Sequence, residues 1–219
     1  MWWLGAVLAC VEPSPCGGGA RPTSIDEAFD SLDALEPVAP GGELALSCFL
    51  ASLERPLGLE LTSDTFSAQP AQGFRSPRIF VRDPALTMSV VPVGTGRDLL
   101  EFGEAHESGL TLKAELVFPL ALPVDREAAF EKTLAFPGAE ATGCQVCHPE
   151  EIDLGGGRFA NTPLRPPDSM IVSLESLRAE HEACDPRADA YRCEMFAALL
   201  DHGEVFQDPF PESHLTLTQ

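Results

Sequence analysis

Apolar and polar residues alternate along much of the first half of the chain, and this pattern restricts the fold more than any other feature. A period of two is typical of strands that bury one face. The clearest run is 110–118, where Thr111, Lys113 and Glu115 separate apolar residues. Further runs lie at 44–50, 57–61, 78–82, 86–93 and 99–102. Several short strands with frequent turn signals predict an antiparallel β sandwich or barrel-like domain over residues 43–122.

After Pro123 the pattern becomes typical of helices. Residues 125–135, 173–183 and 188–202 carry apolar residues at helical spacing. We therefore expect residues 123–219 to form a small α-helical domain. The predicted fold class is α+β, with the β domain first and the helical domain second.

The first ten residues are apolar and end at a cysteine. Val7–Leu8–Ala9–Cys10 resembles the lipobox of bacterial lipoproteins. Because a bilayer span needs roughly 20 apolar residues, residues 1–10 are more typical of a signal segment than of an anchor helix. This resemblance implies a lipid on Cys10 and a lipid-anchored protein in the bacterial periplasm or outer membrane. The alternative is an apolar tail that packs on the fold.

Residues 11–42 predict a flexible tether and one short helix. The tether contains two prolines before Arg21, a third directly after it and a run of three glycines, which cannot bury a face. Ser24 stands three residues before Glu27, a capping-box pattern that predicts the start of a helix reaching Leu35.

The chain is strongly acidic, with 34 acidic and 14 basic residues and a formal net charge of -20. Nucleic acid is therefore excluded as a partner, because phosphate binding needs clustered Lys and Arg on the surface. Such a charge either keeps the protein soluble or steers a basic partner toward it.

Seven cysteines indicate an oxidising compartment, a metal or a redox role. If Cys10 carries lipid, the other six form three groups along the chain. We expect Cys184 and Cys193 to form a disulfide that joins two helices. Cys16 and Cys48 are the second candidate pair, although Cys48 also fits a buried free cysteine on the face of a strand.

The third pair belongs to the only motif with a specific chemical interpretation. Gly143–Cys144–Gln145–Val146–Cys147–His148 contains the C-x-x-C-H pattern of covalent haem attachment. Its spacing places both sulfurs along one porphyrin edge and brings the histidine beneath the iron. Three other interpretations are a thioredoxin-like redox pair, a structural zinc site completed by Cys184 and Cys193, and a plain disulfide or chance match.

Because of this motif, the segment 125–212 resembles a small monohaem cytochrome c domain. The resemblance implies one haem c attached to Cys144 and Cys147, with His148 as the proximal ligand. The stretch 161–165 also resembles a Thr-Pro-x-Leu-Arg segment of dihaem cytochrome c peroxidase-like proteins, but the second haem motif of those enzymes is missing. The implied function is one-electron transfer with a redox protein partner, so the chain is expected to be a carrier rather than a catalyst.

The sixth iron ligand is commonly a methionine or a second histidine. We expect Met195, on the last predicted helix, to serve; ordinary core packing is the alternative. The other candidates are Met170, His181 and His202.

Two further classes of function stay open. One is a haem-based sensor or ligand binder with an exchangeable sixth position. The other is a surface lipoprotein without haem, stabilised by zinc or disulfides, that acts as a binding module. In each case the predicted membrane contact is the lipid on Cys10 alone.

Overall fold

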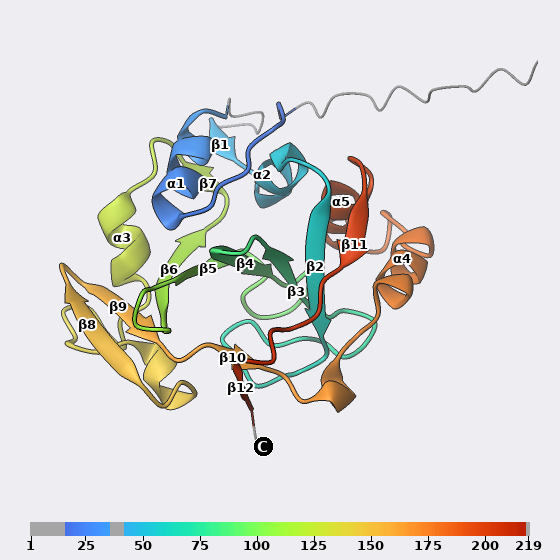
Figure 1. The fold of residues 1–219 in the computed structure, drawn as a ribbon. Helices are drawn as coiled ribbons and strands as arrows, with labels where there is room; N and C mark the ends of the chain where they lie inside the picture. The colour runs from blue at the N-terminus through green and yellow to red at the C-terminus, as the bar shows by residue number, and fades with distance from the viewer. Residues whose placement is uncertain (1–15, 36–41, 218–219) are drawn as a thin grey trace, which may run out of the picture.

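The computed structural model describes residues 16–35 and 42–217, which form an α+β fold around one eight-stranded sheet (Figure 1). The strand at one edge, β11, pairs in parallel with β2, and the other neighbouring strands pair antiparallel. In spatial order the strands are β11 (Val205–Gln207), β2 (Leu57–Thr62), β3 (Arg78–Arg82), β4 (Leu86–Val90), β5 (Leu99–Ala105), β6 (Thr111–Val117), β9 (Arg158–Asn161) and β8 (Glu151–Gly155).

Helices and small sheets complete the fold of the described residues. Two two-stranded sheets pair β1 (Glu43–Leu44) with β7 (Leu120–Ala121) and β10 (Leu164–Arg165) with β12 (Leu215–Thr216). The α-helices are α1 (Ile25–Asp33), α2 (Leu46–Ser52), α3 (Arg126–Glu131), α4 (Leu174–Glu182) and α5 (Ala190–Leu200). Two 3₁₀ turns, η1 (Gly143–Val146) and η2 (Asp168–Met170), lie in the second half.

The hydrophobic core lies between one face of the sheet and the helices. Phe29 of α1, Phe49 of α2 and Phe196 of α5 are fully buried in the same cluster as the inward residues of the strands. Phe29 meets Phe102 of β5 edge to face at 5.8 Å. The strand residues of this core include Leu59, Leu61, Ile79, Val81, Leu86, Met88, Leu100, Phe102, Ala114 and Leu116. The alternation read from the sequence therefore describes the apolar face of a sheet covered by helices.

Five predicted strands and the predicted helices are confirmed, most of them within a few residues. Helix α1 begins as expected, because the Ser24 hydroxyl accepts a hydrogen bond from the Glu27 amide at 3.2 Å. Asp125 and Ser173 cap α3 and α4 in the same way.

The predicted strand at 44–50 is wrong, because residues 46–52 form helix α2. Every residue of α2 is buried, including Ser47 and Ser52. A helix that is buried on all sides does not show a helical apolar stripe, so the alternation of Leu44, Leu46, Cys48 and Leu50 was misleading.

The prediction that residues 123–219 form an α-helical domain also differs from the structure. Strands β8, β9 and β11 come from this segment and join the sheet built by β2–β6. The predicted sandwich or barrel is replaced by this one sheet with helices on one face. β8 and β9 form a hairpin through Gly155–Gly157, with a bulge between Asp153 and Gly155. Most of β8 is exposed and the strand has no buried apolar face, so the sequence of this hairpin shows no strong strand pattern.

Both candidate disulfides are present. Cys16–Cys48 joins the segment before α1 to α2, and Cys184–Cys193 joins the end of α4 to α5. Cys48 is therefore not a free cysteine.

Some expectations lie outside the described residues: the signal segment 1–10, the lipid on Cys10, and residues 11–15 and 36–41 of the tether. Within residues 16–35 and 42–217, none of the helices has the length and apolar character needed to cross a membrane.

The two disulfides close loops of different length, and their contributions to stability should differ accordingly. The separations of 32 and 9 residues correspond to about 3.7 and about 2.6 kcal/mol of lost unfolded-state entropy. We expect Cys16→Ala/Cys48→Ala to lower the free energy of unfolding by about 1 kcal/mol more than Cys184→Ala/Cys193→Ala. Urea unfolding under oxidising conditions measures both values, and the reverse order would contradict this account.

Candidate functional site

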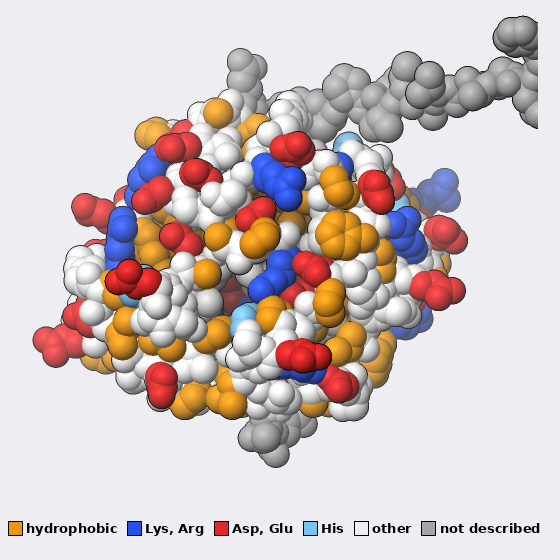
Figure 2. All heavy atoms as spheres, viewed as in Figure 1, with side chains coloured by type: hydrophobic (Ala, Val, Ile, Leu, Met, Phe, Trp, Pro, Cys, Tyr) orange, Lys and Arg blue, Asp and Glu red, His pale blue; other side chains and the backbone are white. Residues whose placement is uncertain are grey.

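The second face of the sheet is polar and lines a cavity of about 370 Å³. Its side chains come from the strand positions between the core residues: Glu60, Thr62, Arg78, Phe80, Arg82, Thr87, Ser89, Glu101, Thr111, Lys113 and Glu115. The size is within the usual range of about 300 to 1,000 Å³ for small-molecule and cofactor pockets. Figure 2 shows the hollow from outside, with basic, acidic and histidine side chains at its mouth.

The C-x-x-C-H motif forms another part of the cavity wall. Cys144, Cys147 and His148 all line the cavity, and both thiols are free and half-buried. The motif is a tight turn in which the Cys147 and His148 amides donate to the Cys144 carbonyl at 3.0 and 2.9 Å. Burial raises the pKa of both thiols, so they are protonated at neutral pH.

Glu151 of β8 anchors the start of this turn. Its carboxylate accepts hydrogen bonds from the Thr142 amide at 3.1 Å and from Asn161 Nδ2 at 2.7 Å. The Thr142 hydroxyl also donates to it. Thr142 and Asn161 are buried, so the β8–β9 hairpin holds the turn in one position.

His148 is oriented by a backbone carbonyl. Its Nδ1 is hydrogen-bonded to the Thr162 carbonyl oxygen, and since a carbonyl only accepts, Nδ1 carries the proton. Burial, together with the nearby cation Lys113, lowers the pKa of His148 to about 4. The imidazole is therefore neutral at pH 7, and the lone pair of Nε2 is available. A metal-binding histidine usually donates a hydrogen bond from its other ring nitrogen, often to a backbone carbonyl, as Nδ1 does here.

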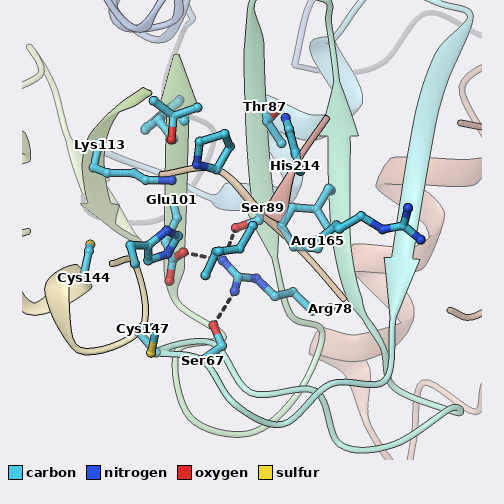
Figure 3. Close-up of a pocket in the computed structure, with 18 of the residues that line it drawn as sticks. Ser67, Arg78, Thr87, Ser89, Glu101, Lys113, Cys144, Cys147, Arg165 and His214 are labelled. Atoms are coloured by element: carbon cyan, nitrogen blue, oxygen red, sulfur yellow. Dashed lines mark hydrogen bonds and ion pairs between the residues drawn. The ribbon is translucent and has the colours of Figure 1, made fainter. Parts of the chain in front are cut away.

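Charged groups on the sheet form two ion pairs. Arg78 donates to Glu101 and to Ser89, as Figure 3 shows. Arg82 Nε lies 3.3 Å from Glu60 Oε1. In contrast, Lys113 has no hydrogen bond or ion pair with the other described residues, although it extends into the cavity (Figure 3).

The structure does not bring the candidate methionine ligands to this cavity. Met195 is 1 % exposed and belongs to the hydrophobic core. Met170 ends η2, where its sulfur lies 3.6 Å from Ser63 Oγ. Neither methionine is among the residues that line the cavity.

The candidate histidines are also elsewhere. His181 Nε2 lies 2.7 Å from Asp201 Oδ1 at the C-terminal end of α5, and His202 follows that helix. The second histidine that does line the cavity is His214, which sequence reasoning missed. It precedes β12, a two-residue strand too short to show a pattern.

The zinc interpretation of the motif loses its extra ligands, because Cys184 and Cys193 are joined in a disulfide. Among the described residues, no group of three or more His, Cys, Asp or Glu side chains is placed to hold a metal ion. Cys144 and Cys147 are not joined to each other, and the motif follows a loop rather than a strand of a βαβ unit.

The buried carboxyl of Glu60 leads to a pH prediction. Burial raises its pKa from 4.5 to about 7, against the opposing effect of Arg82. Protonated Glu60 therefore contributes stability that is complete below pH 4.5 and is lost as the pH rises through 7.

Glu60→Gln mimics the protonated side chain. The free energy of unfolding of the wild type minus that of the variant should fall between pH 4.5 and 7, by at most about 1.4 kcal/mol per pH unit. Urea unfolding at fixed ionic strength measures this difference. A difference that rises with pH, or stays constant, would contradict the assignment.

No protein-family model, curated protein or solved structure matches the chain, so conclusions about this site depend on its own geometry.

Proposed function

We propose that the chain carries one covalently attached haem c at Cys144 and Cys147, with His148 as the proximal ligand, and transfers single electrons in the bacterial cell envelope. The observation that carries the proposal is the placement of these three side chains on one cavity, with Nε2 of His148 left free by the bond between Nδ1 and Thr162.

The residues present fit the chemistry of attachment. Each protonated thiol can add across one vinyl group, forming a carbon–sulfur bond while its hydrogen moves to the neighbouring carbon, so no oxidant is needed. A neutral imidazole is the form that coordinates iron. Both requirements agree with the free thiols and the low pKa of His148.

The walls of the cavity suit a flat, partly apolar group. Phe80 and Phe210 meet edge to face at 5.5 Å, and both line the cavity together with Leu134 and Leu164. In this proposal the sheet and the turn 143–148 hold the haem, and a helical cytochrome c domain is not required.

Electron transfer needs no bond chemistry from the side chains. Bound haem supplies an iron that changes between two oxidation states, and the chain adjusts the potential through burial and through the hydrogen bond to His148. The acidic surface favours a basic redox protein as partner. The two disulfides agree with export, and a lipid on Cys10 would anchor the protein to the membrane.

A second candidate function, reversible binding of a small ligand at the iron, is favoured by one observation. None of the proposed sixth ligands Met195, Met170, His181 and His202 lines the cavity. An iron held by His148 alone would keep an exchangeable position, as in a haem-based sensor.

Haem attachment can be tested directly. The wild-type protein, exported from a host that matures cytochromes c, should stain for haem after denaturing electrophoresis and gain the mass of one haem. Cys144→Ala/Cys147→Ala should lose both signals. Cys184→Ala/Cys193→Ala removes the same number of thiols away from the motif, so it should keep them. A folded wild-type protein without haem would end the proposal.

Binding of carbon monoxide to the reduced protein distinguishes simple electron transfer from reversible ligand binding. We expect the reduced protein to change its absorption spectrum on exposure to carbon monoxide, because no methionine lines the cavity. Met195→Leu, a change of similar volume in the core, should leave the spectrum unchanged. A carbon monoxide-insensitive spectrum that becomes sensitive in Met195→Leu would establish Met195 as the sixth ligand and would favour simple electron transfer.

A further inference from the structure

Basic side chains are concentrated in the cavity of an otherwise acidic chain. The sequence contains 14 basic residues, and the only lysines among them are Lys113 and Lys132. Both lysines line the cavity together with Arg78, Arg82 and Arg165. Five of the 14 basic residues but only four of the 34 acidic residues therefore lie in this lining. The cavity reverses the charge balance of the rest of the molecule.

The acidic residues of the lining do not neutralise all of this charge. Glu101 pairs with Arg78, and Glu60 pairs with Arg82. Burial raises the pKa of Glu60 and Glu115 to about 7, so neither carries a full charge at neutral pH. The fourth acid, Asp64, accepts a hydrogen bond from the amide of Phe66. Positive charge is therefore left over, and neither Lys113 nor Lys132 has a side-chain partner among the described residues.

The sheet makes room for the Lys113 amine. Lys113 stands opposite Gly103 of β5, and a Cβ atom at Gly103 would lie 3.5 Å from Lys113 Nζ. The amine thus lies over the glycine. The same row continues through Thr87 to Arg82, whose Nη1 donates to the Thr87 hydroxyl at 3.2 Å. Two cations therefore share one row of the sheet.

A third cation comes from the opposite wall. The parallel pair β10–β12 places Arg165 beside Thr216, two residues after His214. Arg165 pairs with Asp168 through Nη2, while its Nε is buried without an acceptor. All three cations line the same cavity as His214. Burial, together with these three cations, lowers the pKa of His214 to about 4.

We propose that Lys113, Arg82 and Arg165 form a binding subsite for a small carboxylate or other oxyanion. An anion placed among them would give Lys113 Nζ the acceptor that it lacks, and the guanidinium groups of Arg82 and Arg165 would attract the anion electrostatically. It would also offset the burial that lowers the pKa of Lys113. Buried donors without partners are costly, and charge-assisted bonds are the strong class of hydrogen bond.

The anion has two sources in this cavity. One is the propionate groups of the proposed haem, which lie on the porphyrin edge opposite the vinyl groups. Figure 3 shows Cys144 and Cys147 on one side of the cavity and Arg165 and His214 on the other, which agrees with that arrangement. The other source is a free anion. The first source rests on the proposed function, and the subsite itself does not.

The two lysines make a selective experiment possible, because lysine labelled with ¹³C gives one set of side-chain signals for Lys113 and one for Lys132. Labelled Cys144→Ala/Cys147→Ala, which cannot attach haem, is titrated with sodium acetate and with inorganic phosphate. Sodium chloride at equal ionic strength is the control for screening.

The Lys113 signal should shift and saturate with acetate or phosphate, and chloride should not reproduce this shift. Arg165→Gln in the same background should weaken binding by about tenfold or more, since it removes a charged donor. Arg187→Gln makes the same charge change at an exposed position outside the lining, so it should leave binding unchanged. Equal, unsaturated shifts in all three salts would overturn the subsite, and so would equal effects of the two arginine variants.

A second arm uses the wild-type protein with its haem. If propionates occupy the subsite, acetate and phosphate will shift Lys113 in the haemless variant but not in the haem-loaded protein. If the ligand is a free anion, both proteins will respond. Should the wild type prove to carry no haem, the proposed function fails, while the titration of the haemless variant still decides whether the subsite exists.

Discussion

The strict alternation of side chains in β2–β6 is the constraint on which the rest of the molecule depends. Residues on one face meet α1, α2 and α5 and exclude water, so they supply most of the apolar burial that stabilises the fold. The intervening residues must then face the other way, and here they are charged. A charged face is tolerated because ion pairs such as Arg82–Glu60 lie across neighbouring strands, and because the cavity beside them stays polar.

The motif turn adds chemistry to this face without belonging to the sheet. It is held through its ends: Glu151 fixes Thr142 before it, and the Thr162 carbonyl fixes His148 after it. Both anchors belong to the β8–β9 hairpin and the residue that follows it. The orientation of His148 is thus set by a hairpin at the sheet edge rather than by the helices that surround the motif in the expected cytochrome c domain.

Sequence reasoning found the parts of the fold whose pattern is strong and local. Period-two runs gave β2–β6, and Ser24 and Glu27 marked the start of α1. The prediction failed for α2, which is buried on every side, and for β8, which buries almost nothing, because neither has one apolar face. Cys144, Cys147 and His148 were recognisable from their spacing in the sequence. Lys113 and His214 line the same cavity only because strand pairing and the path of the C-terminal segment bring them there. Such long-range placement leaves no local signal.

Both edges of the sheet are built in a way that discourages the addition of another strand. At one edge β8 carries a bulge between Asp153 and Gly155, and the exposed Asp153 turns its carboxylate to the Gly155 amide at 2.7 Å. At the other edge β11 is only three residues long. Bulges, charged side chains and short edge strands are features that keep natural sheets from pairing edge to edge with copies of themselves. A chain with an open eight-stranded sheet can therefore remain free of edge-to-edge aggregation at high local concentration, such as on a crowded surface.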